Sequence, residues 1–163
     1  MNARTLMTIL VLPLLAVAAY GQPEDAQLRR ELQAYYAQID KHVAAGDCDA
    51  IMRMMDPGLV LVDTEGNRAS YADMKAMVEE IRKSMKGAKS HTAVKHVRRQ
   101  GSDEAVAWIE MTMHYRTNQN GKWVPVKSTH RYAETLRRTP SGWKVFYAQE
   151  LPTNEPWSFK TGG

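Results

Sequence analysis

The order of hydrophobic patterns along the chain is the feature that most limits its fold. Two segments with helical spacing, a short strand-like run and a third helical segment come first. Four long strand-like runs joined by tight turns follow, from His91 to Leu151. Consecutive strands joined by short hairpins form an antiparallel sheet, which must bury one face against other elements. The sequence therefore predicts an α+β domain in which a curved antiparallel sheet wraps around a long N-terminal helix, with two further helices.

The first 21 residues have the composition of a secretory signal peptide. Arg4 gives a positive start, residues 6–19 are almost wholly apolar, and Ala19-Tyr20-Gly21 resembles a cleavage site. The apolar run is shorter than the ~20 residues that span a bilayer, so we expect cleavage rather than a retained membrane anchor. We expect residues 22–163 to form a single exported domain, periplasmic or secreted.

The composition argues against several functional classes. Cys48 is the only cysteine, so stability must come from packing and not from an internal disulfide. The formal net charge of +4 is spread along the chain, without the basic cluster of a nucleic-acid-binding surface. No zinc-ligand spacing, phosphate loop or nucleophile elbow occurs. We therefore expect no metal, no cofactor and no nucleic-acid partner.

Turn and capping residues set the expected limits of the helices. Apolar residues at spacings of three and four over residues 23–45 predict the long first helix. A second helix and a strand over Leu59–Asp63 follow, and a third helix begins near residue 70. The residues expected to start helices are Asp47, Ser70 and Asp73, and those expected to end them are Gly46, Asp56-Pro57-Gly58 and Gly87.

The four long strands are expected to be joined by Gly-, Asn- or Pro-containing hairpin turns. Their expected bounds are His91–Gln100, Glu104–Thr117, Trp123–Arg138 and Trp143–Leu151. After Pro152 the chain is expected to form a tail whose Trp157 and Phe159 pack back on the domain.

Alternation along the strands predicts which side chains face the concave side. The Glu104–Thr117 strand has an apolar face with Met111, Met113 and Tyr115, and an outer face with Trp108, Thr112, His114 and Arg116. The more apolar face of the next strand carries His130, Tyr132 and Glu134. His130 and Glu134 have Cα atoms roughly 13 Å apart, so they cannot bond directly but could line one cavity. A polar group facing a core without a partner costs ~1–3 kcal/mol, so both need water, a ligand or polar neighbours.

Two questions about these strands remain open in the sequence. The first is whether His130 and Glu134 form a binding site or are only solvated at the mouth of a pocket. The second is the direction of Glu150, because both faces of the last strand contain large apolar residues.

Three local patterns resemble the nuclear transport factor 2-like superfamily, and more narrowly its SnoaL-like and ketosteroid-isomerase-like bacterial domains. They are Gly46-Asp47-Cys48-Asp49-Ala50, Leu59-Val60-Leu61-Val62-Asp63 leading into Gly66, and Gly142-Trp143-Lys144-Val145. The resemblance covers residues 22–163 and implies a cone-shaped fold. Members of the superfamily include isomerases, dehydratases, epoxide hydrolases, polyketide cyclases and non-catalytic binding or assembly domains. The fold alone therefore assigns no activity.

The resemblance also implies roles for individual residues. The general base of the isomerases falls on Asp63, for which the alternative is that it simply opens the turn to Gly66. Their acidic hydrogen-bond donor falls near Glu134 or Thr135. Their first-helix tyrosine falls on Ile39, and the nearest tyrosines, Tyr35 and Tyr36, lie one turn earlier. Because that donor is displaced, we do not expect steroid isomerase activity.

Two hypotheses from different classes follow. In the first, Asp63, His130 and Glu134 are catalytic groups in a pocket for a small, largely apolar or carbonyl-containing molecule, and they support isomerisation, dehydration or cyclisation. The residues expected to line that pocket are Tyr36, Ile39, Met111, Met113, Tyr115 and Tyr132. In the second, the chain is a non-catalytic binding or interaction domain that forms a homodimer through the outer sheet face. The sequence does not decide between enzyme and binding domain, and it does not identify a ligand.

Overall fold

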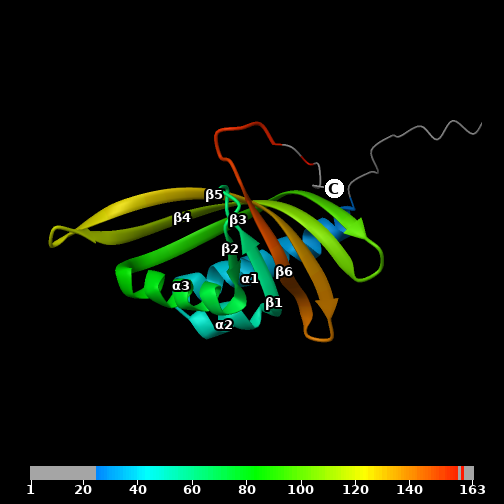
Figure 1. Ribbon diagram of the computed structural model, residues 1–163, viewed down its shortest axis with the longest axis horizontal. Coiled ribbons are helices and arrows are strands. Elements are labelled where there is room, and N and C mark those ends of the chain that lie inside the picture. The colour runs from blue at the N-terminus through cyan, green and yellow to red at the C-terminus, as the bar shows by residue number, and fades with distance from the viewer. Residues whose placement is uncertain (1–24, 158, 160–163) are drawn as a thin grey trace, which may run out of the picture.

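The structure is a computed structural model, and it describes residues 25–157 and 159. These residues form three helices and one six-stranded sheet that is curved and unclosed, as expected for a cone-shaped α+β fold (Figure 1). The helices are α1 (Ala26–Ala45), α2 (Cys48–Arg53) and α3 (Tyr71–Ser84). The strands are β1 (Met55–Val62), β2 (Arg68–Ser70), β3 (Met85–Gln100), β4 (Glu104–Gln119), β5 (Lys122–Thr139) and β6 (Gly142–Leu151).

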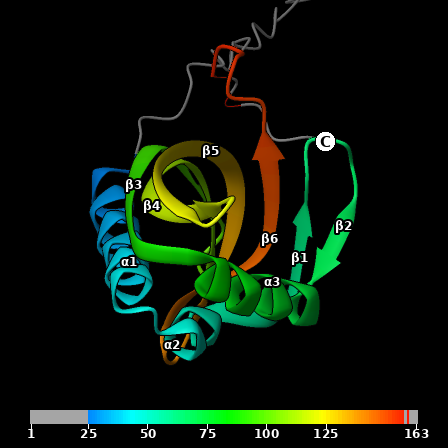
Figure 2. The same ribbon diagram turned by 90° about the vertical axis from the view of Figure 1, so that its left-hand side faces the viewer.

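The sheet has the strand order β2-β1-β6-β5-β4-β3. Strands β3 to β6 are joined by hairpins and pair antiparallel, whereas β1 pairs parallel to β6. The sheet curls, with α1 beside β3 and with α2 and α3 below (Figure 2). The hairpin between β4 and β5 extends far beyond the helices, so the sheet has a packed end and a projecting end (Figure 1).

The caps that the sequence predicts are confirmed. The side chain of Asp47 accepts a hydrogen bond from the N–H of Ala50 at the start of α2. Ser70 and Asp73 form a reciprocal capping box at the start of α3. Gly46 ends α1 with φ 66°, a left-handed conformation that glycine adopts without steric cost.

Two expected helix ends are wrong. We expected Asp56-Pro57-Gly58 to lie between a helix and a strand, but these residues belong to β1, which begins at Met55. A register shift between Met55 and Val60 accommodates them, and proline is tolerated at such an irregularity. Helix α3 ends at Ser84 and not at Gly87; that glycine, at φ 61°, lies in a bulge of β3. The short strand β2 was not expected.

The hydrophobic core lies between α1 and the concave side of the sheet at its packed end. The buried side chains of α1 are Leu28, Leu32, Tyr35, Tyr36 and Ile39. They pack against inward residues of the sheet such as Ile109, Leu136 and Val145, each of them buried. A fully buried side chain of this size contributes about 1.5–3 kcal/mol. Helix α3 has no buried residue and lies at the margin of this core.

Polar side chains of α1 hydrogen-bond to the outer edge of β3. Gln33 donates through Nε2 to the carbonyl of Thr92 at 2.7 Å and accepts from the N–H of Val94 at 3.0 Å. Asp40 accepts from the N–H of Thr92 at 2.8 Å and from the hydroxyls of Thr92 and Ser90. These side chains take the place of a neighbouring strand and fix the rotation of α1 about its axis.

The C-terminal segment folds back over the convex side of the sheet, which confirms that Trp157 and Phe159 pack on the domain. Arg131 donates to the carbonyl of Glu155 at 2.8 Å, and its guanidinium lies 4.6 Å from the ring centre of Trp157. The ring of Phe159 lies 4.6 Å from that of His96 and 5.8 Å from that of Trp108.

The expected signal peptide, residues 1–21, lies outside the described residues, so its cleavage and the export of the chain stay predictions. Among residues 25–157 and 159, no helix has the length and apolar character needed to cross a bilayer.

The contact between Asp40 and β3 can be tested by replacing that carboxylate. Asp40→Ala leaves the N–H of Thr92 without its acceptor, so we expect the free energy of unfolding to fall by about 2 kcal/mol. Urea denaturation measures this change. Glu80→Ala, which removes only an exposed pair with Lys83, is the matched control and should change stability by less than about 0.5 kcal/mol. Equal unfolding midpoints for the Asp40 variant and the wild type would contradict the assigned role.

Candidate active site

Ionisable and aromatic side chains form a row along the concave face of β5. Glu134, Tyr132 and His130 alternate with outward residues, and they pair with Ala107, Ile109 and Met111 of β4, respectively. The row runs from the packed end of the sheet towards its projecting end. The sequence prediction placed His130 and Glu134 on one strand face, and this is the geometry observed.

The deepest part of the row is a hydrogen-bonded pair formed by Tyr36 and Glu134. The hydroxyl of Tyr36 donates to Oε2 of Glu134 at 2.6 Å, which joins α1 to β5. Glu134 keeps some exposure as a whole residue, but its carboxyl lies deep between the helix and the sheet. Burial raises the pKa of this carboxyl from its ordinary value of 4.5 to about 7, although the hydrogen bond from Tyr36 acts in the opposite direction.

A second pair lies nearer the projecting end and is formed by His130 and Glu150. Nδ1 of His130 is 3.2 Å from Oε1 of Glu150, and the two side chains are 38% and 27% exposed. When Nδ1 carries the proton, the carboxylate orients the imidazole and Nε2 is left as an acceptor. This pair is therefore more accessible to solvent than the pair formed by Tyr36 and Glu134.

Tyr132 lies between the two pairs. It pairs with Glu150 across the β5–β6 ladder, and its ring stacks on that of His130 with 6.3 Å between centroids. Burial first, and then the charges of Glu150 and Glu134, raise the pKa of Tyr132, so its hydroxyl stays protonated at neutral pH. It can act as a hydrogen-bond donor between the deep and the exposed carboxylate.

The remaining residues that the sequence places in a pocket lie on α1 and β4. Ile39 is buried in α1, whereas Met111, Met113 and Tyr115 of β4 are only half-buried on the concave face of the projecting strands. These three side chains of β4 therefore keep some contact with solvent. The projecting end offers an apolar surface beside the His130–Glu150 pair.

Asp63 lies at the end of β1, where its carboxylate is part of a turn. Oδ1 accepts from the N–H groups of Glu65 and Asn67, and Oδ2 accepts from the side-chain amide of Asn67 at 2.8 Å. The bond from the side chain of Asn67, followed by the backbone N–H groups, lowers the pKa of Asp63. These contacts match the alternative role, in which Asp63 opens the turn to Gly66. A role for Asp63 as a base stays a prediction.

Two features of the site could not be placed from the sequence. Glu150 faces inward because Phe146 is an extra residue between the pairs Thr135–Tyr147 and Leu136–Val145, which reverses the alternation of β6. The hydroxyl of Tyr36 reaches the acidic residue although it lies one turn before the position that the resemblance implies. The deep pair joins residues 98 positions apart, so no local pattern could reveal it.

The outer face expected to contact a second copy is only partly exposed. Trp108 is 1% exposed beneath the C-terminal segment, and Thr112 is half-buried. His114 and Arg116, on the projecting part of β4, are exposed. The geometry separates this face from the row on the concave side.

The chain belongs to the SnoaL-like domain family, whose model matches residues 32–150. No curated protein matches the chain.

Solved structures with the nuclear transport factor 2-like fold superimpose on most of the chain. A candidate scytalone dehydratase from Novosphingobium aromaticivorans has a TM-score of 0.66 at 12% identity, covering 74% of this chain and 80% of that one. A candidate dehydratase of the NTF2-like family from Streptomyces avermitilis has a TM-score of 0.64 at 14% identity, covering 77% and 96%. A ketosteroid isomerase-like protein from Erwinia carotovora atroseptica has a TM-score of 0.61 at 13% identity, covering 78% and 98%. At these identities the likeness shows the fold alone.

The buried carboxyl of Glu134 should make stability depend on pH. Its pKa in the folded chain lies above its unfolded value, so its favourable contribution is complete below about pH 4.5 and is lost as pH rises through 7. Relative to Glu134→Gln, the wild type should lose about 3 kcal/mol of unfolding free energy across this range. Urea denaturation of both proteins at several pH values measures the difference. Parallel stability profiles for the two would show that the carboxyl does not titrate in this window.

Proposed function

We propose that this domain is a cofactor-independent acid–base enzyme of the dehydratase or isomerase type. The observation that carries the proposal is the pairing of Tyr36 with Glu134, a deep carboxyl whose pKa is raised to about 7. A group that titrates near neutral pH can both give and take a proton at useful rates. The names of the similar structures, which include candidate dehydratases and an isomerase-like protein, support the same class of reaction.

The two pairs suit different steps of such a reaction. His130, oriented by Glu150, acts as the base that removes a proton from a carbon next to a carbonyl. Protonated Glu134, assisted by Tyr36, donates a proton to the substrate oxygen, either the developing enolate in an isomerisation or the leaving hydroxyl in a dehydration. In dehydration the carbon proton goes to the base, the hydroxyl leaves as water with the acid's proton, and a double bond forms. No electron acceptor is needed.

The walls of the concave face indicate the substrate class. Met111, Met113 and Tyr115 give an apolar, deformable surface, and Tyr132 adds a flat ring with a hydroxyl donor. A small, largely apolar compound with a carbonyl or hydroxyl group fits this combination. We further propose that the enzyme acts outside the cytoplasm, on the basis of the leader-like first 21 residues.

The reaction can be tested by hydrogen exchange in D₂O, which reports proton abstraction from any carbonyl compound that the site accepts. A panel of small ketones and β-hydroxy ketones is incubated with the protein, and loss of the proton signal next to the carbonyl is followed by NMR. We expect exchange or elimination with the wild type, and a rate at least about 100-fold lower for His130→Ala and for Glu134→Gln.

His114→Ala is the matched control, because it removes an exposed imidazole from the opposite face of the sheet. It should leave the exchange rate unchanged. Ketones that bind, detected by a raised melting temperature, but that show no exchange would reject the enzyme and favour a binding domain.

A non-catalytic homodimer is our second proposal, favoured by the exposed outer face of the projecting strands around His114 and Arg116. A similar structure is named as a candidate calcium/calmodulin-dependent protein kinase II association domain from Xanthomonas campestris. Sedimentation should then give a dimer whose dissociation constant rises about tenfold in His114→Glu, because two carboxylates would face each other at a symmetric contact. A monomer at all concentrations would contradict it.

A further inference from the structure

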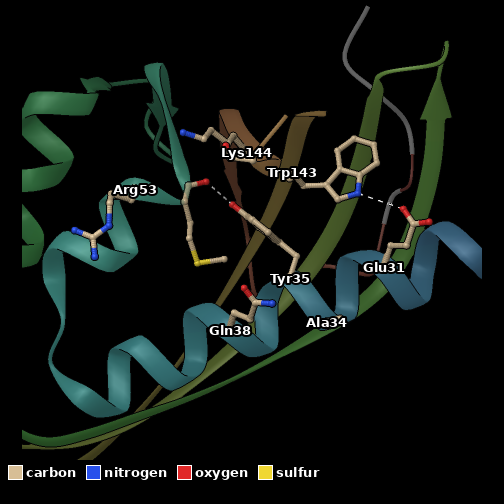
Figure 3. A pocket seen from close by; sticks show the side chains of 10 residues that line it. Glu31, Ala34, Tyr35, Gln38, Arg53, Trp143 and Lys144 are labelled. Carbon is tan, nitrogen blue, oxygen red and sulfur yellow. Dashed lines mark hydrogen bonds between the residues drawn. The ribbon is translucent and has the colours of Figure 1, made fainter. Parts of the chain in front are cut away.

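A cleft of about 310 Å³ lies apart from the row on β5. It is formed where α1 and the end of α2 meet the start of β6 (Figure 3). Its lining residues are Glu31, Ala34, Tyr35, Gln38, Arg53, Met54, Ser141, Gly142, Trp143 and Lys144. None of them belongs to the proposed acid–base groups, so the cleft is separate from the candidate active site.

The cleft carries an uncompensated positive charge. Arg53 and Lys144 lie towards one end, and among residues 25–157 and 159 neither has a carboxylate within ion-pair distance (Figure 3). The one acidic lining residue, Glu31, lies at the other end and is already paired with Arg138 and with the indole N–H of Trp143. The end of the cleft away from Glu31 therefore has two cations beside it and, among the lining residues, no unpaired carboxylate.

Flat side chains line the space between its ends. Trp143 and Tyr35 are each less than a tenth exposed, so their rings are held by packing and present fixed surfaces. The hydroxyl of Tyr35 donates to the carbonyl of Met54 at 2.7 Å, which fixes the tyrosine ring further. Gln38 adds an amide that can donate or accept, and Met54 adds a thioether that adapts to the shape of a ligand.

We infer that this cleft binds a small planar organic anion, such as an aromatic carboxylate, with the carboxylate at Arg53 and Lys144 and the ring beside Tyr35 and Trp143. A guanidinium binds a carboxylate through two parallel N–H donors, and an ammonium adds a point charge. A cleft of this volume is large enough for a ligand with a single ring, at the lower end of the usual range for small-molecule sites.

The cleft is joined to the deep pair through one aromatic contact. The ring of Tyr35 packs edge-on against that of Tyr36, with 5.2 Å between centroids, and Tyr36 donates to Glu134. Burial, and then the charge of Glu134, raise the pKa of Tyr35, so the glutamate's field extends to the floor of the cleft. A bound anion would lie on the far side of this ring from the proposed acid.

The experiment uses benzoate as the probe and Trp143 as the reporter. The four tryptophans are replaced by 5-fluorotryptophan, and the Trp143 resonance is identified from its absence in Trp143→Phe. We expect benzoate to shift this resonance in a saturable way, and Arg53→Gln with Lys144→Gln to weaken the affinity about tenfold or more. Benzamide, which has the same ring without the charge, should bind more weakly by a similar factor.

Matched variants separate this site from the proposed active site. Lys122→Gln removes an exposed cation at the distant hairpin and should leave the benzoate affinity unchanged. A Trp143 resonance that does not respond to benzoate overturns the inference, as does equal affinity for benzamide. Binding that survives loss of both cations but disappears in His130→Ala would place benzoate on the concave face, and it would also overturn the inference.

Discussion

The arrangement of the concave side depends on the hydrogen bonds that hold α1 along the edge of β3. Gln33 and Asp40 lie on one face of the helix and bind the main chain of Thr92 and Val94, which sets both the height and the rotation of α1. That rotation directs Tyr36 at Glu134 and Tyr35 at Met54. The polar side chains on one face of α1 thus set the positions of the buried tyrosines on its other face.

The curvature of the sheet gives two carboxylates on the same concave face different environments. Glu134 lies at the packed end under α1, where little water remains and the neutral acid is favoured. Glu150 lies two residues beyond Ala148, the partner of Glu134, on the half-exposed part of the sheet, and it contacts an imidazole. In the proposed reaction, acid and base would be separated in this way by their positions along two adjacent strands.

The local features of the fold could be predicted from sequence, and the features that depend on strand irregularities could not. Two helix starts are examples: α2 is capped by Asp47, and α3 is capped by Ser70 with Asp73. Each cap is a contact within three residues, so a short stretch of sequence is enough to indicate it. The bulges at Gly87 and Phe146 change which residues face inward without a distinctive local pattern, and they account for the misplaced end of α3 and the open direction of Glu150. Alternation along β5 correctly placed His130 and Glu134 on one face, but their partners come from α1 and β6, distant in sequence.

The way α1 covers β3 has a consequence for the domain at high concentration. A sheet edge with unpaired N–H and C=O groups can pair with strands from other molecules, and it is a common starting point for aggregation. Here the middle of one edge, from Ser90 to Val94 of β3, is occupied by side chains of α1, and the opposite edge is β2, which is only three residues long. Strand-by-strand growth from either side is therefore disfavoured, so contacts between copies of this domain are left to the faces of the sheet.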